Sequence, residues 1–458
     1  MTATGKLLAR RPDRLRVLSA SGQLGYGIPE KALRAGLERR PDFIGCDMGS
    51  VDPGPAYLGS GMMATSPAVT RNDLALVIRA ARQLDVPLVL GTAGTSGASP
   101  HLDATLEMIR SIAREENLHF RMASIRADIP VERVAKALAA NQLRALGGTL
   151  PVSRADLESC AHIVGQMGCE PFQRALDLDP DVIIAGRACD TAIFAAIPQR
   201  LGFDMANVMH MAKVIECTSI CCEPGGRDAI LATLDADGFE LESMNPDRKA
   251  TPLSVAAHSL YEQGDPLTFT EPDGTLSVEH ARYTAIDHRR THVTGATWQH
   301  AVRCTIKVEG SAAIGHRSVL LAATVDPRFI GRLRASLAEV ETTTRSVIAG
   351  DYQIYPRLYG LDGVVPLGAS EPAPRPREVF ILVEVIASSP ELGMAVVKTF
   401  KQYLLHQGFP GRLSTGGNIA FPFTPPEVAA GLAYRYALYH VMPADDSAAL
   451  FPVSVEQV

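Results

Sequence analysis

The sequence predicts an α/β protein with an N-terminal, doubly wound and mainly parallel sheet, followed by a smaller α+β C-terminal domain. Short apolar runs bounded by Gly and Asp recur through the first half of the chain, and amphipathic helical patterns separate them. Such runs are typical of strands buried on both faces, and their alternation with helices is typical of parallel βαβ units. In the last third, strand-like runs follow one another before helices, which favours an α+β domain.

Five apolar runs in the first half are predicted strands. They are residues 16–20, 43–46, 87–90, 120–125 and 182–185. Helices are predicted between them over 70–84 and 101–114, because apolar residues recur there at helical spacing. Another is predicted from Pro130, because proline is favoured at a helix start. Nearer the C-terminus, helices are predicted from about Pro327 and over 391–406.

Three regions are expected along the chain. Residues 1–235 form an α/β, Rossmann-like domain that carries the candidate active site. Residues 236–300 form an irregular insertion or connecting region, because prolines and Asp-Gly turns, such as Asp237-Gly238, interrupt any regular period. Residues 301–458 form the α+β domain.

Composition and charge exclude several classes of protein. Of the 458 residues, 46% are hydrophobic and 21% charged, which is ordinary for a globular protein. The net charge of −6 gives no support for a nucleic-acid partner. The chain lacks an 18-residue apolar run, so no membrane span is predicted. The N-terminus lacks the apolar core of a secretory signal. We therefore expect a cytoplasmic protein, and its size favours a homo-oligomer.

The eight cysteines are expected to be reduced thiols, because no export signal is found. Three of them, Cys217, Cys221 and Cys222, lie close together in the sequence. No second C-x₂-C or H-x₃-H pair follows, so the spacing does not match a zinc site. Small buried thiols are the simpler interpretation.

Polar, glycine-rich segments follow the predicted strands. In a parallel sheet, ligands bind beyond the carboxyl ends of the strands, which meet at one edge. The segments are residues 19–29, 45–54, 91–97, 126–128 and 186–191. A further apolar pair, Val214-Ile215, precedes Glu216. The sequence therefore predicts one pocket at this edge.

Two of these segments are candidate ligand-binding loops. Glycine lets backbone N–H groups approach an anion closely, and a following helix N-terminus adds partial positive charge. Gly22 and Gly25 are the candidates in the first loop, which matches neither a dinucleotide nor a Walker fingerprint, so no nucleotide site is predicted. In the second loop, GTAGTSG, the candidates are Gly91, Thr92, Gly94, Thr95 and Ser96. The alternative for this loop is a tight strand-to-helix turn.

Further substrate-binding candidates carry longer polar side chains. Arg187 suits bidentate recognition of a carboxylate. Arg126 follows the fourth predicted strand, and Arg412 and Asn418 bound another hydroxyl- and glycine-rich loop.

Three carboxylates are candidate acid–base groups: Asp47, Asp190 and Glu216. A carboxylate at the end of a strand suits proton transfer, and burial would raise the pKa of Glu216. The alternatives are a turn residue bonded to its own backbone for Asp47, a helix cap for Asp190 and an ion-pair partner of Arg187 or Arg227 for Glu216. No metal ligands are assigned, although such carboxylates could hold a divalent cation.

Several segments together resemble the AtuA family, named for acyclic terpene utilisation. They are IAGRACD at 184–190, VIEC at 214–217, LLHQGFPGRL at 404–413, TGGNIAFPF at 415–423 and YRY at 434–436. The similarity extends from about residue 15 to 445. The sequence departs from the family pattern after Asp47 and after Cys217, where a Gly-rich stretch is expected. The resemblance implies a role in the breakdown of branched acyl-CoA compounds and carboxylic acids, but no mechanism.

The leading hypothesis is a lyase or hydratase that acts on a small carboxylate or an acyl-CoA. Asp47, Asp190 and Glu216 would transfer protons, while Arg187 and the 91–97 loop would hold the acid. A divalent cation could replace part of this machinery. One alternative is a non-catalytic binding or accessory subunit of a carboxylase or lyase system, because no strong catalytic motif is present. Another is a hydrolase that uses a Cys or Ser at this edge.

Overall fold

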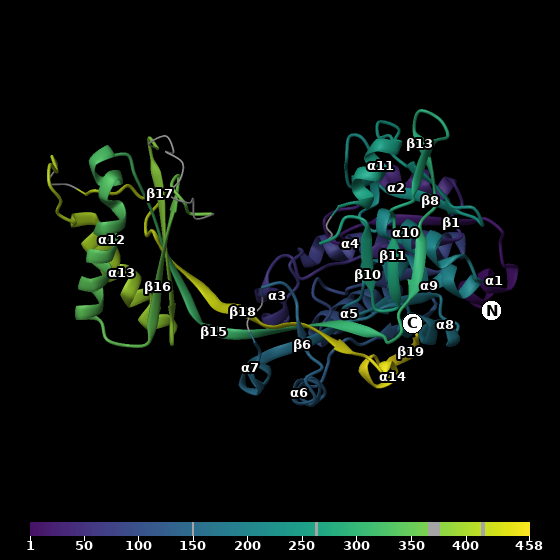
Figure 1. Ribbon diagram of the computed structural model, residues 1–458, viewed down its shortest axis with the longest axis horizontal. Coiled ribbons are helices and arrows are strands. Elements are labelled where there is room, and N and C mark those ends of the chain that lie inside the picture. Colours follow the sequence, from purple (N-terminus) through teal and green to yellow (C-terminus); the bar gives the residue numbers. More distant parts are fainter. Residues whose placement is uncertain (149–150, 262–263, 365–375, 414–416) are drawn as a thin grey trace. The chain divides into compact units, whose positions relative to one another are not determined.

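The computed structural model describes the chain except for residues 149–150, 262–263, 365–375 and 414–416. Its helices and strands form two compact units (Figure 1). The first unit contains Met1–Ala312 and Tyr436–Val458, and the second contains Ala313–Arg435. These boundaries differ from those expected at residues 235 and 300, because strands of the region 236–300 extend the main sheet of the first unit.

The first unit is built on a ten-stranded mixed sheet. Its five central strands are parallel and lie in the order β1 (Leu15–Ser21), β2 (Phe43–Asp47), β3 (Leu88–Gly91), β7 (Val182–Ala185) and β4 (Arg121–Ile125). The predicted strands match these five, and no strand end is shifted by more than one residue. All of them are buried on both faces except at Arg16 and Arg121.

Antiparallel strands extend this sheet at both edges, so it is mixed rather than mainly parallel. Beyond β1 lie β8 (Ile230–Leu234), β9 (Phe239–Ser243), β13 (Arg290–Thr294) and β12 (Arg282–Ala285). At the other edge, β19 (Val453–Gln457) pairs with β4. The Asp-Gly turn at Asp237-Gly238 joins β8 to β9, as a hairpin turn requires.

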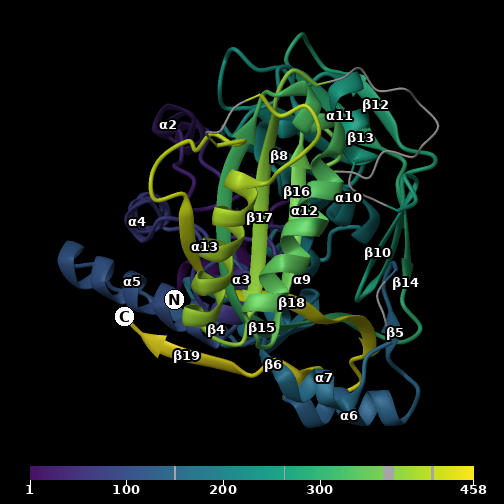
Figure 2. The same ribbon diagram turned by 90° about the vertical axis from the view of Figure 1, so that its left-hand side faces the viewer.

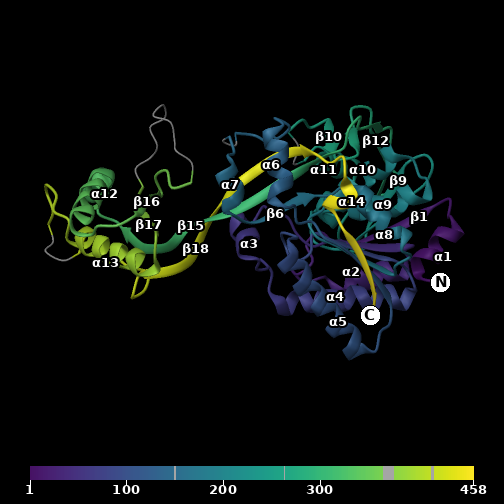
Figure 3. The same cartoon turned by 90° about the horizontal axis from the view of Figure 1, so that it is seen from below.

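Helices cover both faces of the parallel strands (Figure 3). On one face α2 (Glu30–Glu38), α4 (Pro67–Leu84) and α5 (Ser99–Glu116) share a buried core with the sheet. On the other face α8 (Cys169–Asp177), α9 (Asp190–Leu201) and α10 (Met205–Ile215) do so. Neighbouring strand residues alternate between the two cores, as in Val17 and Leu18, because successive side chains of a strand point to opposite faces.

The remaining elements of the first unit are shorter. Helices α1 (Ala3–Arg10), α3 (Pro55–Ser60), α6 (Val131–Ala139), α7 (Arg154–Ser159), α11 (Pro252–Ser259), α14 (Ser447–Leu450) and the 3-10 helix η1 (Thr218–Cys221) lie in its connections. Strands β10 (Thr268–Glu271), β11 (Gly274–Ser277) and β14 (Thr297–His300) form a separate small sheet, and β5 (Arg144–Ala145) and β6 (Cys160–Gln166) pair with the long strands described next.

The second unit packs two helices on one face of an antiparallel sheet. Strands β16 (Tyr352–Tyr359) and β17 (Val379–Ala387) join the long strands β15 (Thr305–Thr324) and β18 (Glu427–Pro443), which contribute residues to both units. Helices α12 (Pro327–Val347) and α13 (Pro390–His406) cover the sheet (Figure 2). Both helices begin at a proline after a capping Asp or Ser, close to where the sequence places them.

Candidate active site

Eight ionisable side chains form a cluster in the first unit, which we call the buried charge cluster. Its carboxylic acids are Asp47, Asp190, Glu216, Glu271 and Glu309, and its cations are Arg187, Lys213 and Lys307. Most of these side chains are almost inaccessible: Arg187 is 3% exposed and Glu309 is 0% exposed. Burial of so many charged groups is costly, so a cluster of this size requires a specific reason.

Three ion pairs hold the cluster together. Arg187 Nε lies 2.9 Å from a carboxylate oxygen of Glu309, and Lys307 Nζ lies 2.9 Å from the other oxygen. Lys213 Nζ donates to Glu216 across 2.6 Å. Asp190 interacts electrostatically with all three cations, and Asp47 with Asp190 and Glu216.

The fold explains why these residues meet. Asp47 is the last residue of β2, Arg187 lies between β7 and α9, and Asp190 is the first residue of α9. Glu216 directly follows α10, three residues after Lys213. Lys307 and Glu309 lie two residues apart on β15, where it pairs with β6, so they share one face of the strand. The carboxyl ends of the parallel strands, the end of α10 and strand β15 therefore supply most of the cluster, and Glu271 comes from the end of β10.

Close backbone contacts confirm that the loops after the strands meet here. A Cβ atom added at Gly22 would lie 2.8 Å from the carbonyl oxygen of Glu216, and one at Gly49 would lie 2.3 Å from that of Thr95. One at Gly97 would lie 2.1 Å from the backbone nitrogen of Arg187. Contacts this short exclude any side chain, so glycine is required at these positions.

Three threonines beside the cluster have left-handed backbone conformations. The φ angles are 48° at Thr92, 90° at Thr95 and 55° at Thr218. A β-branched residue pays a steric cost at positive φ, and such strain is found most often where a functional arrangement requires it.

Burial changes the proton affinity of the carboxylic acids. It raises the pKa of Asp47, and the neighbouring Asp190 raises it further. Burial also raises the pKa of Asp190, although Arg187 opposes the change. The pKa of Glu216 rises to about 8 through burial, against the opposing charge of Lys213, and burial raises that of Glu271 to about 7. Burial alone would raise the pKa of Glu309 as well, but Arg187 and Lys307 outweigh it and lower this pKa.

The charge balance of the cluster agrees with these shifts. With every group ionised, three cations and five carboxylates would give 3 − 5 = −2. Protonation of one or two acids relieves this repulsion. Near neutral pH the cluster therefore contains both carboxylic acids, which can donate a proton, and carboxylates, which can accept one.

Glu271→Gln is expected to reduce the dependence of stability on pH. Unfolded Glu271 titrates near 4.5 and the folded residue near 7, so between these values the native state holds the extra proton. Its contribution to stability is present in full below pH 4.5 and is lost as the pH rises through 7, by about 3 kcal/mol at most. Urea unfolding of both proteins at pH 5 and 8 measures the difference. The exposed Glu279→Gln is the control, and an unchanged pH slope in Glu271→Gln would contradict the assignment.

The family model for the acyclic terpene utilisation family protein AtuA matches residues 89–429, which is most of the chain. The chain belongs to the AtuA family. No curated protein and no solved structure shows a significant match. Seven of the eight residues of the buried charge cluster lie within the range matched to AtuA, and only Asp47 precedes it.

The first candidate loop of this AtuA-family protein lies next to the cluster, but its glycines make contacts within the protein. Gly22 makes the close approach to Glu216 described above. The N–H groups of Gly25, Gly27 and Ile28 donate to the buried carboxylate of Asp73, at 2.9–3.0 Å. That Asp, on α4, occupies the position where an anion would bind.

The second candidate loop is likewise explained by packing. The backbone N–H groups of Thr92 and Ala93 donate to carbonyls of residues 186 and 185, and the hydroxyl of Thr95 accepts from the N–H of Ala64. Gly91 lies against Ile193, and Gly94, with φ 58°, lies against His101. Ser96 is 1% exposed, and its hydroxyl has no hydrogen-bond partner among the described residues.

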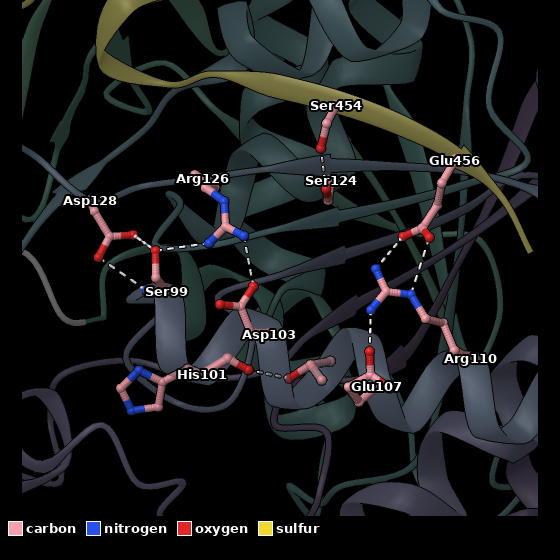
Figure 4. A network of polar contacts seen from close by, with 11 residues as sticks. Ser99, His101, Asp103, Glu107, Arg110, Ser124, Arg126, Asp128, Ser454 and Glu456 are labelled. Carbon is pink, nitrogen blue, oxygen red and sulfur yellow. Dashed lines mark hydrogen bonds and ion pairs between the residues drawn. The ribbon is translucent and has the colours of Figure 1, made fainter.

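Arg126 lies after β4, and its partners are part of the protein (Figure 4). Its guanidinium donates to the hydroxyl of Ser99 at 2.9 Å and to Asp103 at 2.7 Å. Asp128 accepts from the N–H and hydroxyl of the same serine, at the start of α5. Arg126 therefore takes part in a separate network that fixes the N-terminus of α5.

Arg412 and Asn418 belong to the second unit. The Arg412 guanidinium donates to the carbonyl of His406 at 3.0 Å, and the Asn418 amide donates to that of Gln407. Both side chains thereby bind the end of α13. The loop between them includes residues 414–416, which lie outside the described residues.

Sequence reasoning missed four members of the cluster: Lys213, Glu271, Lys307 and Glu309. Two signals were available. A lysine three residues before a glutamate on an apolar helix predicts an ion pair, and charged residues at alternate positions of an apolar strand predict one buried polar face. Glu271 gave no such signal, because it lies in the region 236–300, whose short strands show no clear pattern.

Within the described residues, no group of three or more His, Cys, Asp or Glu side chains is arranged to hold a metal ion. Burial raises the pKa of the Cys46, Cys189 and Cys217 thiols, with carboxylates nearby adding to the shift. A nucleophilic cysteine needs the opposite shift, a lowered pKa.

Of the described helices, none has both the length and the apolar character needed to cross a membrane.

Proposed function

We propose that this AtuA-family protein is a lyase of the hydratase type. It adds water to, or removes water from, a small branched carboxylic acid or its acyl thioester. The observation that carries this proposal is the buried charge cluster. In it, Glu216 has a raised pKa and interacts with Asp190, which in turn interacts with three cations. Acid–base chemistry requires one group that gives a proton and another that takes one, both held in place.

Asp190 is proposed as the general base. Its Oδ1 atom is buried and has no hydrogen-bond partner among the described residues, so it is available to a water molecule. Arg187, Lys213 and Lys307 favour its ionised form. Asp190 is also the first residue of α9, where the helix dipole stabilises a negative charge.

Glu216 is proposed as the general acid, and Asp47 as a hydrogen-bond donor to the substrate carbonyl. In hydration, Asp190 removes a proton from water, the hydroxide adds to the β-carbon, and Glu216 gives its proton to the α-carbon. The base ends protonated and the acid ionised, so protons balance, and Lys213 stabilises the carboxylate that forms. A protonated Asp47 would stabilise the negative charge that develops on the carbonyl oxygen.

The test is turnover and α-proton exchange by the purified chain. In deuterium oxide, a hydratase exchanges the α-protons of β-hydroxy acids or their thioesters, which NMR detects. Glu216→Gln is expected to slow exchange by about 10²-fold or more. Glu115→Gln, an exposed residue of α5, is the matched control and is expected to keep the wild-type rate. Full activity in Glu216→Gln would contradict the proposal, and exchange only in the presence of another protein would favour an accessory role.

A further inference from the structure

The proposed general base, Asp190, is not oriented by a hydrogen bond at its Oδ1 atom, which has no partner among the described residues. A base must nevertheless be held in place, because a displacement of about 1 Å can cost 10²-fold in rate. The backbone on either side of Asp190 therefore has to set its position. Asp190 is the first residue of α9, between Cys189 at the helix cap and Thr191.

Glu271 contacts both neighbours of Asp190. The Thr191 hydroxyl donates to a carboxylate oxygen of Glu271, and the Cys189 thiol interacts with the same carboxyl group. All three side chains are buried, so water has little access to replace these contacts. Glu271 ends β10, 80 residues after Thr191, and thereby ties the start of α9 to a distant part of the chain.

A second acid on the same turn makes a similar contact with a different helix. Asp273 lies between β10 and β11, and it accepts from the N–H of Cys169, the first residue of α8, at 2.8 Å. A Cβ atom added at Gly168 would lie 2.6 Å from the same carboxylate oxygen. Helix α8 carries no member of the buried charge cluster. Asp273 therefore provides an internal control for Glu271.

We infer that Glu271 is a positioning residue for Asp190, which it holds through the side chains of Thr191 and Cys189. This inference rests on the proposed function for the role of Asp190. It gives the region 236–300 a part in the reaction through the turn between β10 and β11, although Glu271 acts through α9 and not on the reacting atoms.

Thr191→Val tests this role, because valine matches threonine in size and shape and leaves every carboxyl group of the cluster in place. The probes are 3-hydroxy-3-methylbutanoate and its N-acetylcysteamine thioester, with α-proton exchange followed in deuterium oxide on the full-length chain. The kcat is expected to fall about 10-fold while KM changes by less than about 2-fold, because a displaced base acts in the transition state. Thr191→Ser keeps a hydroxyl and should restore most of the rate. An unchanged kcat in Thr191→Val, or an equal loss in Thr191→Ser, would overturn the inference.

Asp273→Ala is the matched control. It removes the contact with α8 and is expected to lower stability but to leave kcat unchanged. A comparable loss of kcat there would mean that any loosening of the turn slows the reaction, and the specific role of Glu271 would be wrong.

A double variant tests whether Thr191 and Glu271 act through one contact. Thr191→Val/Glu271→Met should be no slower than the slower of its single variants, because both substitutions break the same interaction. Losses that multiply in the double variant would contradict the inference.

Amide hydrogen exchange, followed by mass spectrometry, reports on α9 independently of any reaction. Thr191→Val is expected to speed exchange about 5-fold in the first two turns of α9, and Asp273→Ala in those of α8 instead. Faster exchange in α9, with a wild type that converts neither probe nor any other β-hydroxy acid or thioester, would refute the lyase and leave Glu271 as the residue that fixes α9. Turnover by the wild type, with unchanged α9 exchange and kcat in Thr191→Val, would do the reverse.

Discussion

Asp190→Asn is expected to lower turnover by about 10²- to 10⁴-fold, the range typical for loss of a general base. Asparagine has nearly the same size and shape as aspartate but cannot accept a proton at neutral pH. The first turn of α9 is therefore expected to persist while the chemistry fails. The loss should appear in kcat, because the base acts in the transition state rather than in substrate binding.

The stability of the same variant is not expected to fall with its turnover. Burial raises the pKa of Asp190, so the ionised side chain is held at a cost to the folded state. Removing that charge should leave the melting temperature unchanged or higher, as is common when a functional group is replaced by a neutral one. A variant that is inactive and as stable as the wild type would exclude simple unfolding as the cause of the loss.

Asp128→Asn is a matched control for this experiment. Asp128 follows β4 at the same edge of the sheet, and its carboxylate accepts from Ser99 (Figure 4). Asparagine keeps one oxygen that can accept one of these two hydrogen bonds, and Asp128 has no part in the proposed chemistry, so normal turnover is expected. If Asp190→Asn kept full activity on a substrate that the wild type converts, the role assigned to Asp190 would be wrong.

Glu309→Gln is expected to destabilise the protein by about 3–5 kcal/mol, the usual effect of removing one partner of a buried ion pair. Glu309 is the shared partner of Arg187 and Lys307, and Arg187 is almost inaccessible to water. Glutamine would remove the one carboxylate that both cations contact, and the buried Arg187 has little access to water that could replace it. Urea denaturation at pH 7 measures the loss.

Glu384→Gln is the matched comparison for Glu309→Gln, because Glu384 is also a strand residue that pairs with two cations. It accepts from Arg317 at 2.6 Å and from Arg357 at 3.2 Å, but these side chains are 33% and 52% exposed. Water can replace the lost interaction there, so about 1 kcal/mol or less is expected. Similar losses in the two variants would contradict the claim that burial makes Glu309 critical.

A double variant separates the cost of an unpaired charge from the value of the pair. Arg187→Met/Glu309→Leu removes both charges and replaces them with apolar side chains. Replacement of a buried pair in this way is often nearly neutral. The double variant should therefore be more stable than Glu309→Gln alone, although Lys307 loses its partner in both.

The family and the five central strands could be read from the sequence, because buried parallel strands are short apolar runs that local composition reveals. The same reasoning placed Asp47, Arg187 and Asp190 at or just beyond the carboxyl ends of strands, where the structure has them. It did not anticipate that β8, β9, β12 and β13 extend the sheet as antiparallel strands. Their pairing depends on contacts between residues far apart in the chain, which a local sequence pattern cannot predict.

The roles of the glycines and cations were decided only by the tertiary structure. A glycine-rich loop has the same composition whether its N–H groups bind a ligand or, as here, the side chain of Asp73. An arginine at a strand end looks equally available whether or not a glutamate 122 residues later neutralises it, as Glu309 does for Arg187. Sequence determines which charged groups exist, whereas folding determines which of them are paired and buried, and burial and pairing set their proton affinity and chemistry.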